Sequence, residues 1–133
     1  MNYLAHAIRV LDDPWQVAGT SLPDWLRVVD KRARLKPNEL RALRIDDGSL
    51  EARVRDGVLR HHDDDLAFHT NATFDALTDE CVHAIRVLSD DPRLRATALG
   101  HIAVEMVLDA CVEELAPGAT ARYYDALAAR DRV

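Results

Sequence analysis

Apolar residues recur every three to four positions along nearly all of the 133-residue chain. Alternation of apolar and polar residues, the pattern of a half-buried strand, is nowhere sustained. This helical period predicts an all-α fold. Because the length is that of one domain and no repeat or linker interrupts it, we expect residues 1–133 to form a single-domain bundle of about five to seven helices.

Proline, aspartate and glycine mark where these helices begin and end. A first helix over residues 3–11 ends before Pro14, which opens a second helix that runs to Val29. We expect Pro23 to kink or break this second helix just before Asp24. The later helices are predicted over residues 38–45, 49–69, 71–88, 92–115 and 119–130.

The chain is acidic, with a net charge of −6. A nucleic-acid-binding surface needs the opposite sign, and aromatic residues at 5% are too few for a base-stacking platform. No apolar run approaches the ~18 residues of a membrane span, and the N-terminus lacks the apolar stretch of a signal peptide. We expect a cytoplasmic protein that binds neither nucleic acid nor membranes, with Cys81 and Cys111 as reduced core residues.

Histidine and carboxylate side chains form a stripe on one predicted helix. His61, Asp65 and His69 are spaced i, i+4, i+8, so they span about 80° of one helix face. Asp65 falls among apolar residues, where a carboxylate is costly to bury unless it is paired or binds a metal. We interpret the stripe as metal ligands, with a satisfied polar core or a solvated face as the alternatives.

A later helix repeats this spacing with His101, Glu105 and Asp109. Imidazole and carboxylate groups on facing helices are how all-α folds build metal sites in their cores. The alternative is that this second stripe is the solvated face of its helix. The adjacent pair His62 and Asp63 would suggest an HD-type metal pair, but helical geometry places both away from the apolar face, which favours surface positions.

Two residues nearer the N-terminus join these candidates. His6 lies on the apolar face of the first helix, where it is either a core histidine or a ligand. Asp24 follows Pro23 and either points into a site or caps the next segment.

A basic run stands out in this acidic chain. Residues 27–44 hold seven Lys or Arg against two acidic residues, which is +5, so the rest of the chain sums to −11. Such a run either docks an acidic partner or a phosphate, or is an ordinary solvated surface.

Four segments, in this order, resemble motifs of the acyl-carrier-protein phosphodiesterase family, which is related to the HD-domain phosphohydrolases. The segments are MNYLAH, GTSLPDWLR, GVLRHHDDDLAFHT and AVEMVLDACV. The resemblance covers residues 1–28 and 55–112. It matches Asp24 to an aspartate needed for metal-dependent activity, and His69 stands where the family has an aspartate.

This resemblance implies an HD-domain-like fold and a metal-dependent phosphoric diester hydrolase. Its substrate would be the 4′-phosphopantetheine ester of a carrier protein or, in so short a chain, a smaller phosphate ester. An acidic carrier protein would dock on the basic stretch Arg27–Arg44. Two other functions stay open: a non-catalytic helical binding or oligomerisation module, and a di-metal bundle with redox or storage chemistry. The sequence leaves open whether the chain forms a homo-oligomer.

The cofactor that we expect is a divalent metal, Mn²⁺ foremost, with Mg²⁺, Fe²⁺ or Zn²⁺ as alternatives. The predicted metal ligands are His6, Asp24, His61, Asp65, Glu105 and Asp109. The predicted catalytic residues are Asp24, His69, His101 and Arg27. In this scheme the arginine neutralises phosphate charge, and a histidine that is not a ligand serves as general acid or base.

Overall fold

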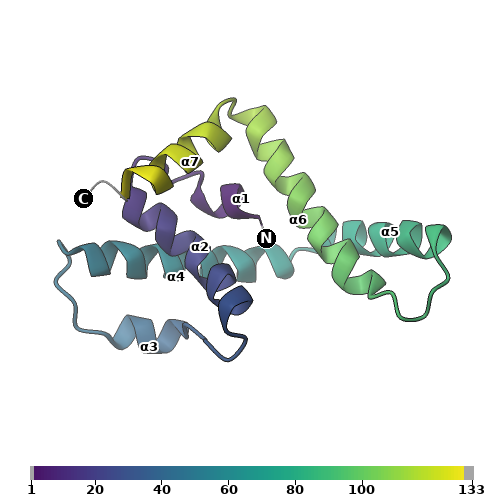
Figure 1. Cartoon of the computed structure of the whole chain (residues 1–133), viewed down its shortest axis with the longest axis horizontal. Helices are drawn as coiled ribbons and strands as arrows, with labels where there is room; N and C mark the ends of the chain where they lie inside the picture. The colour runs from purple at the N-terminus through teal and green to yellow at the C-terminus, as the bar shows by residue number, and fades with distance from the viewer. Residues whose placement is uncertain (1, 131–133) are drawn as a thin grey trace.

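Seven α-helices and no strand make up the described part of a computed structural model, residues 2–130 (Figure 1). The prediction of an all-α fold is therefore confirmed, and the seven helices lie at the upper end of the predicted range of five to seven. The helices are α1 (Tyr3–Ala7), α2 (Pro14–Val29), α3 (Pro37–Ala42), α4 (Leu50–His69), α5 (Ala72–Leu88), α6 (Ala96–Leu115) and α7 (Ala119–Arg130).

Polar caps fix the starts of α2, α4 and α5 where the sequence predicts them. The Asp13 carboxylate accepts hydrogen bonds from the N–H groups of Trp15 and Gln16, both at 3.1 Å. The Ser49 hydroxyl accepts one from Ala52 at the start of α4, and Asn71 caps α5 in the same way. These side chains satisfy backbone donors that a helix start leaves without partners.

Three predicted boundaries are wrong. α3 ends at Ala42 and not at residue 45, and the other two are wrong because local turns compete with the helix. α1 ends at Ala7 and not at residue 11, since the chain then turns through two short backbone hydrogen bonds and buries Leu11. α6 begins at Ala96 and not at Pro92. Its predicted cap, Asp91, instead accepts the N–H of Arg93 at 2.9 Å and closes a turn.

Of the predicted kink or break at Pro23, the break does not occur, because α2 continues through this residue. An internal proline loses the hydrogen bond to the carbonyl four residues earlier, which here belongs to Gly19. We attribute the intact helix to its long contact with α4. The two helices approach closely because Gly19 and Gly57 face each other: a Cβ on Gly57 would lie 2.9 Å from the Thr20 nitrogen.

The main apolar core lies where α1, α2 and α7 meet. Its fully buried members are Leu4, Ala7, Leu11, Val17, Ala119, Tyr123 and Ala126. The Tyr123 hydroxyl pairs with the buried Ser21 hydroxyl at 2.6 Å, and burial, partly offset by this bond, raises the pKa of Tyr123 to about 12. This bond holds α7 against α2.

Helices α5 and α6 form a hairpin that extends from this body (Figure 1). Cys81 on α5 is half-buried and Cys111 on α6 is exposed, so the prediction of a core position is wrong for Cys111. Within residues 2–130, no helix combines the length and apolar character that crossing a bilayer requires.

Candidate metal centre

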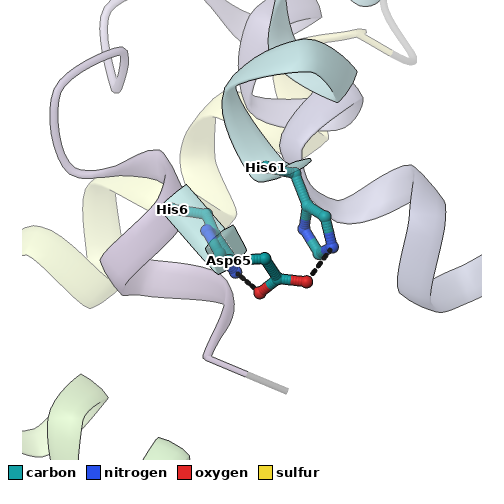
Figure 2. A group of neighbouring side chains, drawn as sticks. All are labelled: His6, His61 and Asp65. Carbon is teal, nitrogen blue, oxygen red and sulfur yellow. Dashed lines mark ion pairs between the residues drawn. The ribbon is translucent and has the colours of Figure 1, made fainter. Parts of the chain in front are cut away.

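The first group of candidate ligands joins α1 to α4 and comprises His6, His61 and Asp65 (Figure 2). We call it the His6 cluster. One ligand atom from each residue lies within 4.8 Å of the others. The Asp65 carboxylate lies between the two rings, with Oδ1 3.3 Å from His6 Nε2 and Oδ2 3.4 Å from His61 Nε2. Both histidines are buried, at 2% and 4% exposure.

The close contact of α2 with α4 orients His61. Its Nδ1 lies 2.9 Å from the backbone oxygen of Thr20, which follows the glycine where these helices meet. A carbonyl can only accept, so Nδ1 carries the proton. Nε2 then faces the Asp65 carboxylate with its lone pair, unless a cation lies between them. That cation is either a second proton on the ring or a metal ion.

His6 provides the sharper test of whether a metal fits. Both of its ring nitrogens are buried and neither makes a hydrogen bond. They lie 3.6 Å from Asp64 Oδ2 and 3.3 Å from Asp65 Oδ1 without hydrogen-bond geometry. Buried polar atoms without such a bond are rare because they forfeit their hydration. A metal ion bound between His6 and Asp65 would satisfy one of these nitrogens.

Electrostatics keeps Asp65 ionised in this setting. Burial opposes its charge, but His6 and His61 hold the pKa of Asp65 well below its ordinary value. In turn, although burial acts against a charged ring, Asp65 raises the pKa of His61. The cluster therefore offers a carboxylate, which is the ionised form that a divalent cation needs.

A second group comprises His69 from α4 with His101 and Glu105 from α6, again within 4.8 Å. We call it the His101 cluster. His101 Nε2 lies 3.0 Å from Glu105 Oε1, and the rings of His69 and His101 stack with centroids 4.7 Å apart. Glu105 is 6% exposed. The two predicted stripes therefore meet, as their spacing on separate helices suggested.

Both clusters contribute to the lining of one cleft of about 690 Å³. Asp65, His69, His101 and Glu105 line it, and so does Asp24. Three arginines also line it: Arg27, Arg86 and Arg95. None of the three forms an ion pair within the described residues.

The structure separates the other predicted residues. Asp24 lines the cleft but belongs to neither cluster, and it acts on His61 only through its charge. Asp109 lies outside both clusters, because its carboxylate accepts the N–H groups of Leu4 and Ala5 at 3.2 and 2.8 Å. Asp109 therefore caps the start of α1.

The adjacent His62 and Asp63 have structural contacts. His62 Nε2 bonds to the backbone oxygen of Leu35 at 2.7 Å, and Asp63 accepts a hydrogen bond from Arg41 at 2.8 Å. Both contacts hold the segment around α3 against α4. Neither residue belongs to a candidate metal cluster.

Arg86 and Arg95 are the site residues that the sequence analysis missed. Arg86 lies in the last turn of α5, and Arg95 is the residue before α6. Neither belongs to a motif or a charge run, so only the folding of the hairpin brings them to the cleft. Comparison of the chain with protein-family models, curated proteins and solved structures found no match.

Proposed function

We propose that this protein is a metal-dependent hydrolase of phosphate esters with an HD-domain-like helical fold. The observation that carries the proposal is the mixed lining of one cleft, with histidine–carboxylate clusters beside three arginines. Imidazole and carboxylate groups bind a divalent cation, whereas guanidinium groups bind a phosphate. A metal ion and guanidinium groups side by side suit a phosphate ester, because its oxygens can contact both.

The His6 cluster would hold the metal. Its nitrogen and oxygen ligands suit Mn²⁺, our first candidate, with Mg²⁺, Fe²⁺ and Zn²⁺ as alternatives. The buried nitrogens of His6, which make no hydrogen bond, support this role. When bound, such an ion polarises a phosphoryl oxygen and lowers the pKa of a water molecule.

The remaining cleft residues would bind and orient the ester. Arg27, Arg86 and Arg95 come from three different segments and border the same space. Guanidinium groups orient phosphate oxygens through paired hydrogen bonds and offset charge that develops on them. Asp24, in the same lining, is our candidate for accepting a proton from the attacking water.

For the macromolecular substrate we propose an acyl carrier protein, because of the sequence motifs and the basic segment 27–44. A second cavity, of about 460 Å³, connects this segment to the centre. Its lining includes Lys36 and Arg34 from the basic segment together with Asp24, His61 and Asp65. An acidic protein bound to the segment would therefore lie next to the candidate ligands.

Hydrolysis of bis(4-nitrophenyl) phosphate with added Mn²⁺ tests the proposed chemistry. Asp65→Asn should abolish turnover, and Arg86→Gln should slow it on the order of 100-fold, as for loss of one charge-stabilising donor. Arg93→Gln is the matched control, since this exposed arginine pairs with Asp91 outside the cleft. Full activity of Asp65→Asn, or no activity of the native protein with any of the four metals, would contradict the proposal.

The carrier-protein substrate is tested separately. Reversing Arg32 and Arg34 to Glu should slow turnover of an acyl carrier protein strongly, and more at low than at high salt. Cleavage of the small diester should hardly change, because it does not need the docking surface. Equal losses on both substrates would rule out a docking role for these arginines.

A further inference from the structure

The imidazole rings of the His101 cluster are fixed by an aromatic wall. Phe74, which is buried, packs against His69 and His101 with ring centroids 4.9 and 5.0 Å away. Phe68 packs against Phe74 in a tilted arrangement, with ring centroids 4.4 Å apart. Side chains held in this way lose little further freedom when they bind a ligand. The cluster is therefore preorganised, although its two histidines come from different helices.

Asp65 occupies the space between the two clusters. Its Oδ2 faces His61, while its Oδ1 lies 3.3 Å from His6 Nε2 and 3.8 Å from His69 Nε2. One carboxylate therefore faces ligand atoms of both groups. In helical carboxylate proteins, such carboxylates and histidines on facing helices together form metal sites in the core.

We propose that His69, His101 and Glu105 form a second divalent-cation site, next to the His6 cluster and joined to it by Asp65. The site is half-open: Glu105 is almost fully buried, whereas both histidines border the cleft. Three protein ligands with an open side leave room for water or a substrate oxygen at the metal. The proposal concerns cation binding and does not depend on the proposed hydrolase activity.

The donor set selects the class of cation. Two imidazoles and one carboxylate, the same donor set as in the His6 cluster, suit transition-metal ions such as Mn²⁺, Fe²⁺, Co²⁺ or Zn²⁺ better than Mg²⁺, which prefers an all-oxygen shell. This site offers two nitrogen donors, whereas Mg²⁺ sites use oxygen donors. Co²⁺ is the useful probe, because its visible absorption reports the ligands that surround it.

Metal stoichiometry of the full chain, measured by Co²⁺ titration and by native mass spectrometry, tests this site. The native protein should bind about two ions per chain, and His69→Gln and His101→Gln should each bind about one. His6→Gln should also bind about one, with the absorption spectrum of the His101 cluster kept. His83→Gln is the control, because this histidine is exposed on α5 outside both clusters, and it should still bind two.

Circular dichroism of each metal-free variant establishes that it is folded before the ions are counted. His69→Gln is the safer variant, because its side chain is one-third exposed. A single ion that is lost in His101→Gln but kept in His6→Gln still supports the second site. Stoichiometry that stays unchanged in both His69→Gln and His101→Gln, or native protein that binds no ion, overturns it.

Discussion

The body of the molecule and its α5–α6 hairpin are packed in different ways. In the body, α2 and α4 touch through glycines and α1, α2 and α7 share a buried core. The hairpin has few fully buried side chains, and it exposes large apolar ones such as Leu88 at 86% and Met106 at 62%. The body therefore holds its own shape, whereas the hairpin is fixed mainly by its own two helices.

This difference bears directly on the candidate centre. The His6 cluster lies wholly within the body, on α1 and α4, whereas the His101 cluster needs α4 and α6 together. The cleft between them takes Arg27 from the body and Arg86 from the hairpin. The geometry of the first cluster is thus set by tight packing, and that of the second by how the hairpin rests on α4.

A methyl group added at a helix contact should destabilise the body much more than the hairpin, and this is the largest difference that we expect between the two regions. Gly57→Ala should lower the free energy of unfolding by about 3 kcal/mol, because its Cβ would meet the backbones of Gly19 and Thr20, which cannot turn aside. Gly100→Ala in the hairpin should cost less, about 1 kcal/mol, because its Cβ would lie 2.8 Å from the Val82 side chain and 3.1 Å from the Thr78 backbone oxygen, which are less severe contacts than those at Gly57. Urea unfolding of both variants measures this, and equal losses would remove the distinction.

A smaller effect is expected at Asp13, which joins two helices of the body. It caps α2 and accepts a hydrogen bond from Arg53 of α4 at 2.8 Å. Asp13→Ala should therefore cost about 1–2 kcal/mol at pH 7, and Asp13→Asn less, because asparagine keeps the cap but not the charge.

The pH dependence of that loss follows from the ionisation of Asp13. Burial acts to raise its pKa, but the bonds from Arg53, Gln16 and Trp15 outweigh it and lower the pKa. The stabilisation is then complete above about pH 4, the ordinary value in an unfolded chain, and is lost as the pH falls through the lower folded pKa. Urea titrations at several pH values should show that the difference in free energy of unfolding between native protein and Asp13→Ala becomes smaller below pH 4. A difference that grows there would contradict the ion pair.

The smallest effect should come from the exposed apolar residues of the hairpin. Leu88→Gln should change the free energy of unfolding by less than about 0.5 kcal/mol, because this side chain is already in water. Thermal unfolding at two protein concentrations provides the measurement. A large loss, or a loss that depends on concentration, would mean that the hairpin face is covered in solution.

The sequence predicts those features that depend on neighbours along the chain. Ser49 and Asn71 cap helices as expected, and the spacing of His61 and Asp65 places them on one inward face. It fails where a local turn competes with a helix, as at Asp91, and it does not decide whether a helix continues through a proline, as α2 does at Pro23.

The site shows the same limit. Spacing within α4 and within α6 could identify each stripe, but not how the stripes divide into clusters. His69 joins the residues of α6 because of the hairpin, and Arg86 reaches the cleft for the same reason. No pattern along the chain carries this information, since it arises only when α5 turns back onto α6.

The contact of Asp109 with α1 changes how mutations at this position should be understood. A helix of five residues is too short to persist by itself, and this one carries His6. Asp109 holds its first N–H groups from α6. Replacing Asp109 would therefore displace the His6 imidazole and weaken cation binding without removing a ligand. In an alanine scan alone, Asp109 would look like a metal ligand. The absorption spectrum of a bound ion distinguishes the two roles, because it stays unchanged when the set of ligands is the same.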